Sequence, residues 1–317
     1  MMGKVETTAG VDAAPQETNS YEPVRLIEPF TIDITQENIE VTGGLGSLGY
    51  SRPYATVRPA GVTFRTFVQG IDATTYTATV KPPIGQWLRA CGMIESFVSS
   101  NASGVPQYDY TPANRVQSQT SLTMVAHVDG YEHRMTAGMG NCNIIGVAAT
   151  PFIAEFTMRG VLTTEASTTR GTPVGFPSNT PPRWIGSGSI FVSSLGAVIE
   201  NLNFNTNNTV FEQRASLAPS GSGIIKILIT ERAPGGSFDP EMTTASSYDW
   251  INAWRSTSGS LLQVRAGTVQ GNTFTLVCSQ AISKTLARQD KSGLAVFGID
   301  WQAYEVAGGD DFRISFT

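Results

Sequence analysis

The order of the elements expected between residues 82 and 162 constrains this chain more than any other feature. A short helix is predicted at residues 83–91, because Pro83 fits the first helical turn and Gly92 can end the last one. Residues 108–112, Tyr-Asp-Tyr-Thr-Pro, are expected to form a polar loop. Two strands around an Asp-Gly turn, within residues 121–135, and a further strand at residues 151–160 complete the series.

The hairpin within residues 121–135 has a predictable register. A two-residue turn at Asp129 and Gly130 pairs His127 with Glu132 and leaves His133 one position further along. Because side chains alternate between the faces of a strand, the two histidines should point to opposite sides of the sheet. We therefore do not expect this hairpin to hold a metal ion or a hydrolase dyad.

Composition favours a β protein whose surfaces are largely covered by partners. Only 15% of the 317 residues are charged, while the chain contains 32 glycines and 17 prolines. A monomeric β-sandwich with a neutral surface is the alternative. The formal net charge is −5 and no block is rich in Lys or Arg, which argues against a nucleic-acid-binding protein. A mildly acidic protein would let DNA slide along its surface without binding to it. The same net charge is also ordinary for a soluble protein.

The sequence also indicates where the protein folds. Cys91, Cys142 and Cys278 are widely spaced and match neither a zinc pattern nor a disulfide framework, so we expect a reducing compartment. The N-terminus lacks the charged and apolar regions of a signal peptide. No apolar run approaches the roughly 20 residues of a membrane span. A soluble protein made inside a cell, without metal or cofactor, is expected.

The chain divides into four segments by composition. They are a polar arm (1–23), a first β module (24–165), a linker rich in Thr, Ser, Pro and Gly (166–183) and a second β module (184–317). The small polar residues of the arm are typical of disorder unless a neighbouring subunit orders it. Both modules show an early strand, a helix carrying Trp, a hairpin with a glycine turn and a late strand. The same spacing separates Gly130 from Phe156 and Gly271 from Phe297, which indicates a duplication.

Further elements are expected from alternation and from turn residues. Strands are predicted at residues 31–35, 62–68, 76–80, 189–199, 224–231, 260–269, 273–279, 295–301 and 312–316, with a helix at residues 248–255 and a tight turn at Gly271 and Asn272.

Motifs for catalysis are scarce. Residues 44–49 match G-x-G-x-x-G, but Pro53 follows too closely for the helix that would hold a pyrophosphate. Neither a P-loop nor a G-x-S-x-G pattern occurs. The acidic residues that could be paired for glycoside hydrolysis are Asp239, Glu241, Asp300, Asp310 and Asp311. The last two follow two glycines and are more simply interpreted as a turn.

The order of the helix, the Tyr-Thr-Pro segment, the Val-Asp-Gly hairpin and the Glu-Phe-Thr strand resembles the phage tail tube protein family. The second half carries similar features, namely residues 231–239 before a helix, Gly267 and Gly271 in a hairpin, and a terminal strand after Asp311. The resemblance covers residues 53–317 and does not extend to the preceding arm.

The resemblance implies a mainly β fold of tail-tube-like β-sandwich or barrel modules, each with a flanking α-helix and two per chain. It implies a structural subunit of the phage tail, with no enzymatic activity, that assembles into stacked rings through which DNA is ejected. Three chains would form a pseudo-hexameric ring, and six chains are the alternative. The hairpins at Asp129, Gly130, Gly271 and Asn272 are candidates for the ring edge or the lumen.

Further partners follow from the same resemblance. They are the tape measure, tail terminator and distal tail proteins, while DNA passes without specific binding and no membrane is involved. The protein would reach the virion tail from the host cytoplasm, and residues 1–21 and 163–182 would lock rings together. Two alternatives remain open: another tail part on the same fold, such as a terminator or a sheathed tube, and a β-sandwich carbohydrate-binding or glycan-hydrolysing module of a tail fibre.

Overall fold

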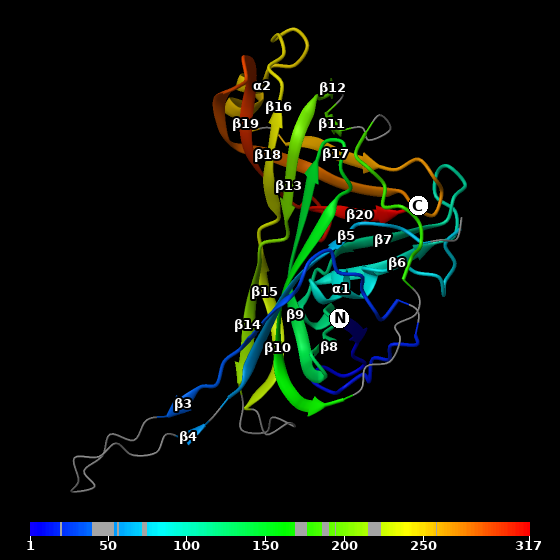
Figure 1. Ribbon diagram of the computed structural model, residues 1–317. Helices are drawn as coiled ribbons and strands as arrows, with labels where there is room; N and C mark the ends of the chain where they lie inside the picture. The colour runs from blue at the N-terminus through cyan, green and yellow to red at the C-terminus, as the bar shows by residue number, and fades with distance from the viewer. Residues whose placement is uncertain are drawn as a thin grey trace, which may run out of the picture.

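The computed structural model describes residues 1–19, 21–39, 54–55, 57–71, 75–168, 176–185, 190–193, 195–214, 223–257 and 259–317. The chain is mainly β, as expected, and its described part holds two α-helices, α1 (Gly85–Ala90) and α2 (Trp250–Ser256) (Figure 1). The strands of the first half are β1 (Met2–Val5), β2 (Thr31–Ile34), β3 (Asn38–Ile39), β4 (Tyr54–Ala55), β5 (Pro59–Phe67), β6 (Met93–Val98), β7 (Gln107–Pro112), β8 (Leu122–Val128), β9 (Tyr131–Val147) and β10 (Ile153–Ser167). Those of the second half are β11 (Ile190–Val192), β12 (Leu195–Gly196), β13 (Ile199–Asn205), β14 (Asn208–Arg214), β15 (Ile224–Arg232), β16 (Gly235–Pro240), β17 (Ser260–Ala266), β18 (Phe274–Lys291), β19 (Leu294–Ala303) and β20 (Arg313–Phe316).

Most strands belong to one 16-stranded sheet. The part that runs β18–β19–β16–β13–β9–β10–β5–β2, which we call the long sheet, is antiparallel at every step. It passes between the halves of the chain where β13 pairs with β9, with Asn203 opposite Ile145. A second crossing joins β20 to β7, with Ile314 opposite Tyr110. The two halves therefore share one sheet.

Two long strands, β9 and β18, each serve two layers. The first part of β9 pairs with β8 and its last part pairs with β13. Similarly, the first part of β18 pairs with β17 and β20, and its last part pairs with β19. Strands β6, β7 and β20 and helix α1 lie to one side of the long sheet (Figure 1).

The core lies on the face of the long sheet that meets α1 and the second layer. Burial alternates along β5 and β10, so that one side of each strand is packed and the other is open. Phe64 stacks on Phe156 with their ring centroids 5.3 Å apart, and Trp87 of α1 meets Phe64 edge-on at 4.6 Å. Between the halves, Phe152 and Phe274 lie 5.4 Å apart. One apolar cluster thus serves both halves.

Several predicted elements are confirmed. The helix expected at residues 83–91 is α1, and Gly92 follows it with a left-handed φ of 80°. The Asp129-Gly130 hairpin has the predicted register, with His127 opposite Glu132. The helix expected at residues 248–255 is α2, which Asp249 caps by accepting a hydrogen bond from the backbone N–H of Asn252 at 2.9 Å.

Two predictions in the first half are wrong. Residues 108–112 form strand β7 and not a loop, because β6 pairs with one edge of this segment and β20 with the other. Residues 76–80 do not form a strand. Tyr76 is instead buried, and its hydroxyl donates a hydrogen bond to the Gly271 carbonyl at 3.0 Å. Strand β10 also continues to Ser167, into the segment expected to be a linker.

In the second half, the strands expected at residues 224–231, 260–269, 295–301 and 312–316 are confirmed as β15, β17, β19 and β20. Strand β18 is longer than expected, and the turn at Gly271 and Asn272 lies in a wider loop between β17 and β18. The strand expected at residues 189–199 is replaced by the short strands β11 and β12 in its described part. The glycine motif at residues 44–49 lies outside the described residues.

The expectation that a neighbouring subunit orders the N-terminal arm is wrong. Strand β1 pairs with β8 of the same chain, with Met2 opposite Val125. The buried Glu6 carboxylate then accepts hydrogen bonds from Ser121 Oγ at 2.5 Å, Thr123 Oγ1 at 2.9 Å and the Ala137 N–H at 2.9 Å. The chain supplies these partners itself, so the arm packs on its own subunit.

The same order of pairing occurs twice along the chain. In the first half it is β9–β10–β5–β2, and in the second half it is β18–β19–β16–β13. The hairpin β3–β4 separates β2 from β5, just as β14–β15 separates β13 from β16. A helix follows in both halves, α1 after β5 and α2 after β16.

Candidate functional site

The face of the long sheet that points away from the core is polar over most of its width. We call it the polar face. Its polar residues include Thr31, Asp33, Thr63, Arg65, Asn141, Asn143, Glu155, Thr157, Arg159, Asn201, Asn203, Asn205, Ser237, Asp239, Thr285, Gln289, Lys291, Asp300 and Gln302, and its apolar ones include Phe67, Ile145, Val147, Ile153 and Ala287. It is continuous because the strands that carry it are hydrogen-bonded neighbours.

Strand register aligns these side chains in rows across the sheet. One row runs from Asp300 through Ser237 and Asn203 to the apolar Ile145, Ile153 and Phe67. Residues directly opposite each other in antiparallel strands point to the same face, so each row is a line of neighbouring side chains. Small uncharged amides and hydroxyls dominate the rows. Such side chains form hydrogen bonds with water without presenting a fixed charge.

Part of the polar face is hollowed. A depression of about 410 Å³ on the polar face is lined by residues of β9, β13, β16, β18 and β19. A separate depression of about 480 Å³ lies on the second layer. Asn201, Asn203, Asp239, Thr285 and Asp300 line the depression on the polar face. It is a shallow polar concavity on a sheet.

Asp239 is the most strongly engaged carboxylate in this hollow. Oδ1 accepts hydrogen bonds from the N–H groups of Glu200 and Asn201 at 3.0 and 2.6 Å, and Oδ2 accepts one from Lys291 Nζ at 2.9 Å. Burial disfavours its charged form, but the bonds from Lys291 and Asn201 outweigh this and lower the pKa of Asp239. Lys291 also pairs with Glu200 at 2.5 Å. Asp239 is therefore an ionised, structural carboxylate.

Charges are also paired at the other end of the polar face. Arg65 Nε bonds to Glu155 at 2.5 Å, and Arg65 Nη1 lies 3.0 Å from Glu28. The hydrogen bond to Glu155 raises the pKa of Arg65. Asp300 is exposed and accepts a hydrogen bond from the Thr285 hydroxyl at 2.7 Å. Arg65 and Lys291 are thus each paired with two carboxylates.

A hairpin bounds the polar face. Strands β14 and β15 pair with each other, and Ile227 and Ile229 of β15 pack with Met139 of β9 and Val161 of β10 in a small apolar cluster. The part of β9 and β10 around Met139 and Val161 is therefore covered, whereas the strand ends nearest the Asp129-Gly130 turn are largely exposed.

The structure places the predicted candidate residues away from the polar face. Asp129 and Gly130 form an exposed turn, and the space around Gly130 is open. Gly271 and Asn272 instead join the halves of the chain: Asn272 Oδ1 accepts a hydrogen bond from the Gly70 N–H at 2.8 Å, and the Gly271 carbonyl accepts one from Ile71 at 2.9 Å. Their assignment to the ring edge or the lumen stays a prediction.

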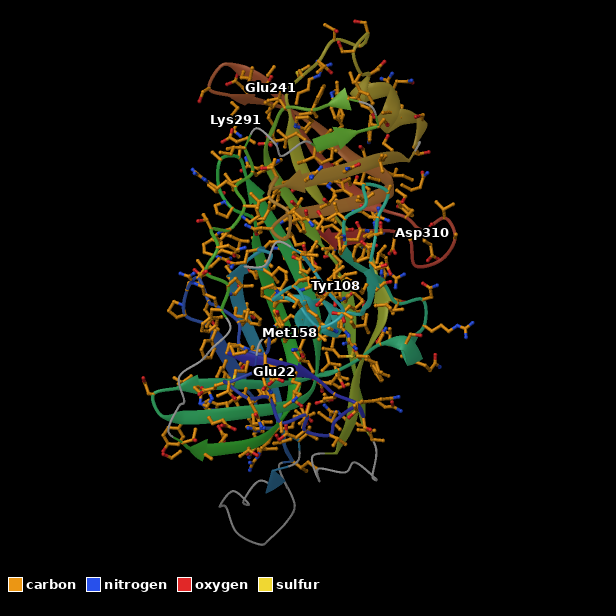
Figure 2. All side chains as sticks on the ribbon, turned by 90° about the vertical axis from the view of Figure 1, so that its right-hand side faces the viewer. Glu22, Tyr108, Met158, Glu241, Lys291 and Asp310 are labelled. Atoms are coloured by element: carbon orange, nitrogen blue, oxygen red, sulfur yellow. The ribbon has the colours of Figure 1, made fainter. Side chains whose placement is uncertain are left out.

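The five acidic residues considered for hydrolysis are not gathered in one place. Asp239 and Asp300 line the hollow, whereas Asp310 lies well apart from Glu241 and Lys291 in Figure 2. Asp311 is buried and pairs with Arg232 at 2.8 Å.

The three cysteines are buried. Burial raises the pKa of the Cys91, Cys142 and Cys278 thiols, so the nucleophilic thiolate is disfavoured at each. Among the described residues, His, Cys, Asp and Glu form no group of three or more that could hold a metal ion.

Sequence reasoning missed the polar face, although a signal for it exists. Residues 201–205, Asn-Leu-Asn-Phe-Asn, alternate polar and apolar side chains as a half-buried strand does. The low strand propensity of Asn and Gly obscured β13 and β16.

No described helix is long and apolar enough to cross a bilayer. No protein-family model matches this sequence, and neither does any curated protein.

Proposed function

We propose that this chain is a structural subunit of a bacteriophage tail tube, which self-assembles into stacked rings that form the channel for DNA ejection. The observation that carries the proposal is the long sheet, with its apolar face packed internally and its polar face turned outward. A polar sheet that continues from subunit to subunit would make the wall of a water-filled channel.

The repeated strand order supports two tail-tube-like modules per chain, each with a flanking helix. One module would contribute β9–β10–β5–β2 with α1, and the other β18–β19–β16–β13 with α2. The β13–β9 pairing then joins two modules within a chain. Three chains would supply six modules and a pseudo-hexameric ring, with a hexamer of chains as the alternative.

The polar face suits a lumen through which DNA passes without specific binding. Phosphate binding depends on clustered Lys and Arg, and counterion release would hold the DNA in place. On the polar face Arg65 and Lys291 are each paired with two carboxylates, and Arg159 lies 3.9 Å from Glu212. The proposal places the protein in the virion tail, with the tape measure, tail terminator and distal tail proteins as its partners. Hairpin β3–β4, which extends from the body in Figure 1, and residues 163–182 would contact the next ring.

A glycan-binding or glycan-hydrolysing module remains a second candidate because Asp239 and Asp300 share the hollow. Retaining or inverting hydrolysis needs one carboxyl group that stays protonated as the acid. The lowered pKa of Asp239 disfavours that role. A glycan array and a hydrolysis assay with Asp239→Ala and Asp300→Ala test this candidate directly.

Electron microscopy and mass measurement of the purified chain test the main proposal. Tubes, or rings whose mass equals three or six chains, are the expected result. A chain that stays a monomer at every concentration would overturn it, and one that also cleaves or binds glycans would favour the second candidate.

A further inference from the structure

We propose that strand β2 of one chain pairs, antiparallel, with the last part of β18 in a second copy of the chain. This joint would continue the long sheet from subunit to subunit. The inference rests on the proposed function, because the joint is what would close the ring.

Both strands have an open edge. Within the described part of the chain, β2 pairs with β5 alone. Strand β17 pairs with β18 only as far as Ala281, and β20 only with Phe274–Val277 at its start, so the stretch from Ile282 to Lys291 pairs with β19 alone among the described strands. Unpaired strand edges are sites for pairing with another chain.

The directions of the two strands fit an antiparallel joint. Every step from β18 to β2 is antiparallel, and the number of strands on the path is even. Strands β18 and β2 therefore run in opposite directions. Rotation about a ring axis along the strands preserves these directions, so a rotated copy would place its β18 antiparallel to β2.

The chain already contains an equivalent joint. Strand β13 ends the order β18–β19–β16–β13, and β9 begins the order β9–β10–β5–β2. The two pair over five residues, from Asn201 opposite Val147 to Asn205 opposite Asn143. In the four-strand set β9–β10–β5–β2, the strand that corresponds to β13 is β2. In the set β18–β19–β16–β13, the strand that corresponds to β9 is β18. An intermolecular β2–β18 joint would repeat the β13–β9 joint.

Charge does not select the register of this joint. Asp33 is exposed on the polar face of β2, whereas Arg288 of β18 lies opposite the buried Phe297 and points to the other face of the sheet. The Lys284 carbonyl already accepts a hydrogen bond from Trp254 Nε1 at 3.1 Å. The residues of β18 that could pair with β2 therefore begin after Lys284.

Disulfide trapping tests the joint. Thr31, Asp33 and Ala287 lie on the polar face, whereas Ile34 alternates with Asp33 and points to the other side. Opposed residues in a joint share a face at disulfide distance. We expect assembled Thr31→Cys/Ala287→Cys or Asp33→Cys/Ala287→Cys chains to form covalent oligomers up to the full ring on oxidation. The Ile34→Cys/Ala287→Cys control should form none.

A mixing experiment fixes the polarity of the contact. Chains with Asp33→Cys alone and chains with Ala287→Cys alone should form a covalent dimer only when mixed before assembly. Rings that assemble normally, by mass and microscopy, but give no cross-link with either pair would overturn the joint and leave the proposed function intact. A wild-type chain that forms no oligomer would overturn both.

Discussion

Asn203 of β13 lies opposite Ile145 of β9, and through this pair the long sheet passes from one half of the chain to the other. The polar face is continuous only because this contact is made. The other edge of β13 pairs with β16, where Gly236 lies opposite Phe204. Because Gly236 has no side chain, β13 and β16 can approach each other closely. The predictions below start from this part of the sheet.

We expect Gly236→Ala to destabilise the fold by about 1–3 kcal/mol, the range for overpacking. A Cβ at this position would lie 1.8 Å from the Asn203 carbonyl oxygen, so one strand must move. Denaturant unfolding measures the effect. Gly196→Ala is the matched control, because a Cβ there meets nothing within 4 Å. Equal stability of the two variants would contradict the close approach of β13 and β16.

Glu6→Ala should release the N-terminal segment from β8 and β9. The substitution removes a buried carboxylate, so the Ser121 and Thr123 hydroxyls and the Ala137 N–H lose their acceptor. The free energy of unfolding should fall by about 2 kcal/mol or more. Limited proteolysis should then cut within the first 19 residues. The Asp12→Ala control breaks an exposed pair with Arg134 and should cost at most about 1 kcal/mol. Equal protease resistance of both variants would show that Glu6 does not hold the segment.

The stability that Asp239 provides should be lost at acid pH. Its pKa is lowered in the folded protein from an ordinary value of 3.8, so its contribution is fully present above that value. The contribution fades as the pH falls through the folded pKa. Thermal midpoints of wild type and Asp239→Asn, measured between neutral pH and about pH 2, should differ most at neutral pH and converge at the acid end. Lys291→Met, which removes a bond that lowers this pKa, should shrink the difference.

Two substitutions distinguish the candidate lumen surfaces. If the polar face lines the channel, Asp300→Lys should slow DNA release from particles that carry it, because a new cation would bind phosphate. Asp129→Lys, in the exposed turn outside the polar face, should leave the rate unchanged. Both variants should assemble. The reverse result would assign the lumen to the hairpin at Asp129 and Gly130.

The three thiols should be inert in the native protein. All are buried, and burial raises the pKa of each. A thiol reagent should label none of the three cysteines in the native protein. In denaturant it should label all three in each chain. Rapid native labelling of any thiol would show that the fold opens at that cysteine.

Local patterns in the sequence predicted the elements whose signals are local. The Asp129-Gly130 turn determines its hairpin without help from other segments, and Gly92 ends α1. Residues 108–112 were misread because their strand depends on pairing with β6 and with β20, and β20 is far away in the sequence.

Most of the polar face was missed for the same reason. It consists of strands whose neighbours are set by pairing between the halves, and Asn201, Asn203 and Asn205 have low strand propensity when each is considered alone. The docking of the N-terminal segment likewise depends on Glu6 meeting partners more than a hundred residues away.

The contact between β13 and β9 is made by a single polypeptide. In an annulus of such chains every second seam would form as the chain folds, at the high effective concentration that a covalent tether provides. Only the alternate seams would depend on diffusion and subunit concentration, so each annulus would need half as many intermolecular seams as one built from single-module chains.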